Sequence, residues 1–185
     1  MKRRLRYIMA TAAALEIFAA TAGIGHSAPH RSASPVDVIL IKATDRALVD
    51  QMRCQGVPAV AKAVNAMLKN RLITYTSNES GVYLFSPTAP VTFLGLPVRS
   101  VSGFEYDDDF NGVPPSRMVG TAPPVFLQID VVASVAELRN RALKAGLVEA
   151  IPHQHQHGFQ VSAGGSYLAP KTHAVISSIE CALYP

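Results

Sequence analysis

Three histidines alternate with glutamines in the C-terminal part of the chain, at His153, His155 and His157. Neutral imidazole is a common ligand of zinc and copper ions. In an extended strand, alternate residues share a face about 6.6–7 Å apart, so two neighbouring histidines can chelate one ion. A third ligand must come from elsewhere, and His173 is the candidate. We interpret the segment as a polar, solvated hairpin tip, and a metal site at these histidines is the alternative.

A second candidate for ion binding lies at Asp107, Asp109 and Asn111. With Gly112 they match the D-x-D-x-N-G opening of a calcium-binding loop. The position at which such a loop needs a bidentate glutamate is Met118, and two prolines soon follow the glycine. We interpret the segment as a solvated acidic turn. A loop that binds a cation or a basic partner is the alternative.

The N-terminal segment, residues 1–28, has the pattern of a signal peptide. A basic start precedes an apolar stretch over residues 8–22 and then small residues suited to cleavage, which we expect between residues 22 and 28. A membrane anchor is the alternative, but Glu16 lies in the middle of the stretch, where a carboxylate costs about 2.5–3.5 kcal/mol. We therefore expect a periplasmic or secreted protein that has no stable membrane insertion after cleavage.

The charge of the chain belongs mostly to this leader. Residues 1–28 hold four of the 17 lysines and arginines and one of the 13 acidic residues. The remaining residues 29–185 are nearly neutral and contain no basic cluster, which argues against a nucleic-acid partner. A hydrophobic fraction of 49% with 16% charged residues excludes a disordered chain.

The two cysteines, Cys54 and Cys181, form an even pair. In an oxidising compartment such a pair favours a disulfide over a catalytic thiol. A bond between them closes most of the domain into one loop. Two buried thiols are the alternative that spacing does not exclude.

The periodicity of apolar residues predicts one α+β domain over residues 29–185. In the first half we expect a buried strand at residues 36–41, two helices at 44–54 and 58–70, a hairpin with strands at 72–76 and 82–86, and a strand within 91–106. A connector rich in Pro, Gly and Asp follows at 107–123. In the second half we expect a strand at 125–132, a helix at 134–145 that opens on the capping box from Ser134 to Glu137, and strands at 147–151, 159–163 and 173–184.

The two halves, residues 36–106 and 124–184, have a similar order of elements. Residues 59–75 match residues 134–150 at six of 17 positions. We interpret this as a duplication that produces two βαβββ halves on a mixed or largely antiparallel sheet. Shared bias towards Ala, Val and Leu is the alternative.

This order of elements resembles the vicinal oxygen chelate proteins, in which paired βαβββ modules surround a metal ion. The resemblance implies ligands on the first and last strands of each module. The corresponding strands here offer Glu105, Gln128 and Glu180 as an alternative metal set, together with Asp37. The histidine that the family uses is absent from these strands, and most of the family works inside the cell.

No motif of a nucleotide-binding loop, a nucleophile elbow or a zinc protease occurs in the chain. We therefore expect an exported binding or protein-interaction protein without catalytic activity, whose partner is an envelope or secreted protein. We assign no cofactor. A metal-dependent enzyme that resembles the vicinal oxygen chelate group is the alternative, and it would need a divalent metal.

Overall fold

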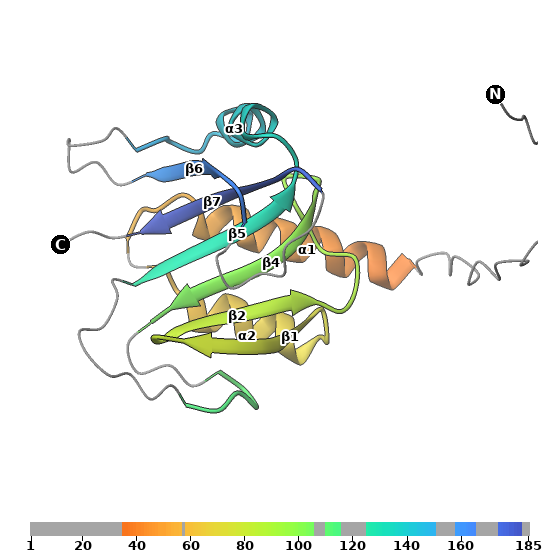
Figure 1. Ribbon diagram of the computed structural model, residues 1–185. Coiled ribbons are helices and arrows are strands. Elements are labelled where there is room, and N and C mark those ends of the chain that lie inside the picture. Colours follow the sequence, from red (N-terminus) through yellow and green to blue (C-terminus); the bar gives the residue numbers. More distant parts are fainter. Residues whose placement is uncertain are drawn as a thin grey trace, which may run out of the picture. The chain divides into compact units, whose positions relative to one another are not determined.

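Three helices cover one face of an antiparallel sheet in the part of the chain that the structure describes (Figure 1). The computed structural model describes residues 35–56, 58–105, 110–115, 125–150, 158–165 and 174–182, all within the compact unit Ala33–Pro185. The helices are α1 (Pro35–Gln51), α2 (Val60–Lys69) and α3 (Val135–Lys144). The strands are β1 (Ile73–Glu79), β2 (Val82–Pro87), β3 (Thr92–Phe93), β4 (Leu96–Phe104), β5 (Phe126–Val132), β6 (Phe159–Ala163) and β7 (Ile176–Ala182). The prediction of a single α+β domain is confirmed.

The helices α2 and α3 form where their apolar spacing and caps predict them. Val60, Val64 and Met67 follow helical spacing along α2 and are buried. At the start of α3 the Ser134 hydroxyl accepts a hydrogen bond from the Glu137 amide at 3.2 Å, which satisfies one of the unpaired amides of the first turn.

The first helix corrects the sequence prediction, because residues 36–41 lie in α1 and not in a strand. A short apolar run rich in Val and Ile has the same composition in a buried strand and in a helix, so periodicity does not separate the two. Pro35 is the first residue of α1, a position that its fixed φ angle suits. Thr44, the first residue of the helix expected at 44–54, lies inside α1, where its hydroxyl donates to the Leu40 carbonyl at 2.9 Å.

The order of strands in the sheet is β1-β2-β4-β5-β7-β6, with β1 at one edge and β6 at the other. The short strand β3 pairs with the N-terminal end of β4. Every pair of strands is antiparallel. Ser80 and Gly81 connect β1 and β2 with positive φ angles of 52° and 87°, as a two-residue hairpin turn requires. In place of the strand expected at 147–151, the described residues form only an isolated bridge between Glu149 and Phe159.

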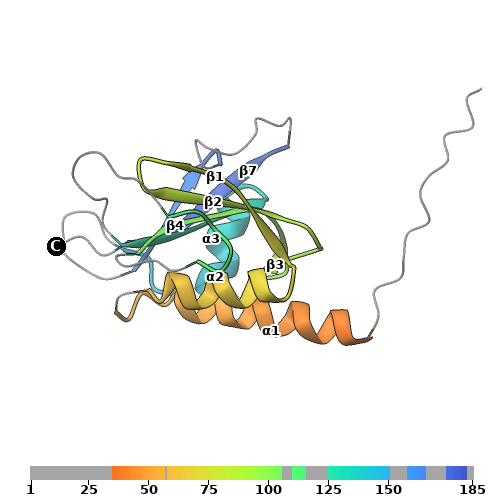
Figure 2. The same cartoon turned by 90° about the horizontal axis from the view of Figure 1, so that it is seen from below.

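The two faces of the sheet differ in chemistry. On the helical face, Val101, Leu127, Ile129 and Ile179 belong to one hydrophobic core, which also includes Leu138 of α3. Figure 2 shows α1 and α2 side by side along that face. On the other face, strands β4, β5 and β7 carry serine, glutamine and acidic side chains. The helices therefore bury the apolar face, and any site built on polar groups of the central strands lies on the opposite one.

The carboxylate of Asp45 joins α1 to the sheet. It accepts hydrogen bonds from the amides of Leu94 and Gly95 at 2.7 and 3.2 Å, in the turn between β3 and β4. From α3, Arg141 donates to the Leu94 carbonyl at 2.9 Å. Side chains of two helices thus hold this turn.

A helix followed by two strands occurs at each end of the sheet. The unit α2-β1-β2 lies at one end and α3-β6-β7 at the other, with the pair β4-β5 between them. The strand that was expected to precede α2 is replaced by α1, so the first half does not have the βαβββ order. The common origin of the two halves stays a prediction.

Candidate functional site

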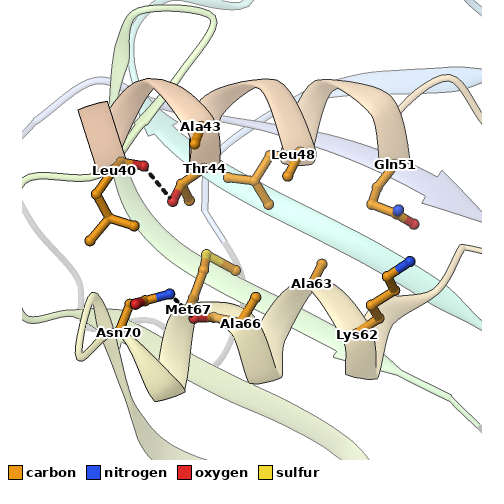
Figure 3. A pocket seen from close by; sticks show the side chains of 11 residues that line it. Leu40, Ala43, Thr44, Leu48, Gln51, Lys62, Ala63, Ala66, Met67 and Asn70 are labelled. Carbon is orange, nitrogen blue, oxygen red and sulfur yellow. Dashed lines mark hydrogen bonds between the residues drawn. The ribbon is translucent and has the colours of Figure 1, made fainter. Parts of the chain in front are cut away.

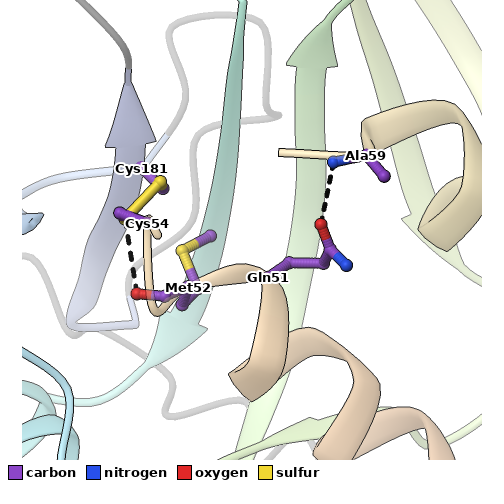
Figure 4. Close-up of a disulfide and its surroundings, with 5 residues drawn as sticks. All are labelled: Gln51, Met52, Cys54, Ala59 and Cys181. Atoms are coloured by element: carbon purple, nitrogen blue, oxygen red, sulfur yellow. Dashed lines mark hydrogen bonds between the residues drawn. A yellow bond between two sulfur atoms is a disulfide. The ribbon is translucent and has the colours of Figure 1, made fainter. Parts of the chain in front are cut away.

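The disulfide between Cys54 and Cys181 is confirmed (Figure 4). Their Cα atoms lie 5.7 Å apart across a sequence separation of 127 residues. Both cysteines are buried, Cys54 just after α1 and Cys181 on β7. The bond therefore links the segment that follows α1 to β7, the strand next to the edge strand β6.

The structure brings two of the three alternative metal ligands together. Gln128 and Glu180 are cross-strand partners on β5 and β7. Glu105 follows β4, and its carboxylate accepts a hydrogen bond from the Ala61 amide at 2.7 Å. It thus stabilises the N-terminus of α2 on the helical face. Among the described residues, no group of three or more His, Cys, Asp or Glu side chains could hold a metal ion.

The histidine cluster and most of the acidic loop lie outside the described residues. These are His153, His155, His157 and His173, together with Asp107 and Asp109. Asn111 is described, and its backbone amide donates to the Asn65 side chain of α2 at 2.8 Å. The turn 110–113 is thereby attached to α2. Binding of a cation at any of these residues stays a prediction.

A buried polar network connects the central strands on the face without helices. The carboxylate of Asp130 on β5 is 1% exposed and accepts hydrogen bonds from Ser100 of β4, Ser178 of β7 and the Gln128 amide. The Ser178 and Gln128 distances are 2.7 and 2.8 Å. Such hydrogen bonds compensate for the loss of water around a buried carboxylate. The network therefore links three neighbouring strands.

Glu180 lies beside this network, and burial raises the pKa of its carboxyl. Because the native state disfavours the charged form of Glu180, this group does not reduce stability below its ordinary pKa, and it lowers the stability of the domain as the pH rises through the raised value. We expect Glu180→Gln to increase the free energy of unfolding near neutral pH and to change it little in acid. Urea denaturation across this pH range measures the difference.

The matched control is Glu79→Gln, at an exposed position on the edge strand β1. A gain in stability for Glu180→Gln that is the same at every pH would contradict the expected linkage.

An apolar groove of about 250 Å³ runs between α1 and α2. Figure 3 shows Leu40 and Leu48 of α1 opposite Ala66 and Met67 of α2. Polar side chains occur among its lining residues, and these are Thr44, Gln51, Lys62 and Asn70. The groove can accept a small apolar group but offers few directional contacts.

A larger cleft of about 580 Å³ lies where α2 ends and the edge strand β1 begins. Ile73, Thr74 and Tyr75 of β1 form one side, and Lys69 and Arg71 lie at the end of α2. The turn 110–113 closes the cleft on a third side. The Phe110 ring holds this turn in place. It is buried against the rings of Tyr83 and Phe85 of β2, whose centroids lie 4.7 and 5.4 Å from its own. This cleft is concave, basic and bordered by an edge strand.

Sequence reasoning missed the cleft and the role of Asp130. The spacing of Gln128 and Asp130, two residues apart in a strand, places both on one face and was a usable signal. The cleft had no local signal, because the turn 110–113 on its third side is distant in sequence from residues 68–75, which form the other two sides. Tertiary contacts, such as the hydrogen bond between Asn111 and Asn65, bring the two segments together.

Among the described residues, no helix is long and apolar enough to cross a membrane. Comparison of the chain with protein-family models, with curated proteins and with solved structures finds no match.

Proposed function

We propose that this chain is an exported, non-catalytic binding protein that recognises a partner protein of the cell envelope. The observation that carries the proposal is the cleft at β1, because a concave surface with a rigid wall and few convergent polar groups suits binding. The disulfide supports export, because such bonds persist in oxidising compartments. The signal-peptide pattern of residues 1–28 agrees with it.

The geometry favours this function over the metal-dependent alternative. Glu105 stabilises the start of α2, and Gln128 with Glu180 lies on the other face of the sheet. These three side chains do not converge on one position. A metal enzyme would have to draw ligands from residues outside the described part.

Site-specific photo-crosslinking tests the binding function. A photoreactive amino acid replaces Thr74, which lines the cleft and is exposed, in the full chain expressed in its native envelope. We expect one discrete protein adduct, which excess unmodified protein suppresses. The matched control carries the same group at Arg46, on the exposed surface of α1. No adduct from Thr74, or the same adducts from both positions, would contradict the proposal.

A further inference from the structure

We propose that β1 binds an extended, acidic segment of the partner protein, which adds to the sheet as a further strand beyond β1. This inference rests on the proposed binding function and names its site and its mode of recognition. Three observations carry it: the direction of the backbone groups of β1, the cleft beneath that strand, and the charge beside it.

The backbone of β1 directs hydrogen-bonding groups away from the sheet. Pro87, which has no amide proton, faces Ile73 in the register, so this pair exchanges no ladder hydrogen bonds. Leu72 and Thr88 form the adjacent, hydrogen-bonded pair, and the Thr88 amide donates to the Leu72 carbonyl at 2.9 Å. Since bonded and non-bonded pairs alternate, the amide and carbonyl groups of Ile73 and Tyr75 point to the outer edge.

This outer edge is open in the part of the chain that the structure describes, where β1 pairs with β2 alone. A register shift between Tyr75 and Ser77 interrupts the strand. Irregularities of this kind limit pairing along an edge. The edge therefore offers a short docking segment centred on Ile73 and Tyr75, which an extended peptide can satisfy through main-chain hydrogen bonds.

The cleft lies beside this segment and gives side chains of the added strand a place to bind. Ile73 and Tyr75 share a face with the core, and the apolar groups of Leu68 and Val113 also line the cleft. Alternate residues of an extended peptide point to the same side, so every second side chain can enter the cleft.

Charge defines the partner as acidic. Lys69 and Arg71 are exposed and line the cleft, whereas none of the described residues that line it is acidic. Neither cation takes part in the ion pairs between described residues, which join Arg53 to Asp50, Arg139 to Glu149 and Arg141 to Glu137. Complementary charge of this kind steers association and disfavours basic partners. A second copy of this chain would bring its own Lys69 and Arg71 close to the same edge.

Nuclear magnetic resonance on the oxidised domain, residues 29–185, tests the proposal once a native fold has been verified for it. The probes are three octapeptides in which valine alternates with glutamate, with glutamine or with lysine. We expect the glutamate peptide to shift the resonances of the cleft and to slow hydrogen exchange of the Ile73 and Tyr75 amides. The backbone amides of every second peptide residue should point towards β1. Methylation of these nitrogens should abolish binding, and methylation of the nitrogens of the intervening residues should not.

Charge-reversal variants supply the matched control. We expect Lys69→Glu/Arg71→Glu to weaken binding of the glutamate peptide about tenfold, since each exposed charge contributes modestly. Arg46→Glu/Lys62→Glu makes the same change of net charge away from the cleft and should alter affinity less than about twofold. Thermal unfolding verifies that each variant folds.

Several outcomes overturn the proposal. These are equal binding of the three peptides, no protection of Ile73 and Tyr75, or binding that the charge reversal at Lys69 and Arg71 leaves unchanged. A concentration-dependent dimer that protects these two amides without peptide would assign the edge to a second copy. If the crosslink from Thr74 persists in the charge-reversed variant, the binding function stands and the acidic strand addition fails.

Discussion

Reduction of the disulfide between Cys54 and Cys181 is expected to lower the free energy of unfolding by about 4–5 kcal/mol. The bond closes a loop across a sequence separation of 127 residues, so its loss gives the unfolded chain much more conformational freedom. For a domain of this size, each kcal/mol shifts the melting temperature by about 2–4 °C. The melting temperature should therefore fall by about 8–20 °C.

Urea denaturation with and without a reductant measures this loss. Reduction should also increase the dependence of unfolding free energy on urea, because the unfolded chain becomes less compact. The control is Cys54→Ala/Cys181→Ala, which should be insensitive to the reductant. An unchanged unfolding midpoint in reduced wild-type protein would refute the prediction, and so would two titratable thiols in denatured, unreduced protein.

The sequence predicted the elements whose signals are local. The capping serine of α3, the apolar spacing of α2 and the hairpin of β1 and β2 each depend on residues within one turn or one hairpin. The turn of that hairpin is shorter than the one expected between strands at 72–76 and 82–86, because residues 77–79 belong to β1. The disulfide was predicted from the number of cysteines together with the export signal. These features need no knowledge of the strand order, which is why sequence reasoning found them.

The errors occurred where tertiary contacts decide the structure. Residues 36–41 form helix because α1 packs on α2 and β3 and is tied to the β3-β4 turn through Asp45. Residues 148–150 approach β6 so closely that a Cβ atom on Gly158 would lie 2.6 Å from the Ala150 nitrogen and the Val148 oxygen. The expected strand is thus reduced to a single parallel bridge. Local composition contains neither of these contacts.

The candidate binding cleft depends even more on long-range order. Its basic groups lie at the C-terminal end of α2, its edge belongs to β1, and its third side is fixed by the hydrogen bond between Asn111 and Asn65, which lie 46 residues apart. An aspartate-rich turn with a proline-rich continuation predicts a connector, with a loop that binds a cation or a basic partner as the alternative, and neither prediction indicates a cleft. In the structure, the turn 110–113 forms one side of the cleft at β1.

Asp130→Ala is expected to destabilise the domain by about 2–4 kcal/mol, the second large effect. The substitution removes the acceptor of hydrogen bonds from Ser100, Gln128 and Ser178, and it leaves the hydroxyls of Ser100 and Ser178 in a buried site without this acceptor. Hydrogen bonds to a charged group contribute about 1.5–3 kcal/mol each. The substitution also removes the free-energy cost of burying a carboxylate. This gain is smaller than the loss, because the donors lose their common acceptor.

Ser102→Ala provides the matched control, because Ser102 is also buried on this face of β4 but is not among the three donors that bind Asp130. We expect it to cost less than about 1 kcal/mol. Equal effects of the two substitutions in urea denaturation would show that burial alone, and not the network, determines the loss. If the network links β4, β5 and β7 as the contacts indicate, hydrogen exchange in Asp130→Ala should accelerate in all three strands and should leave the β1-β2 hairpin nearly unchanged.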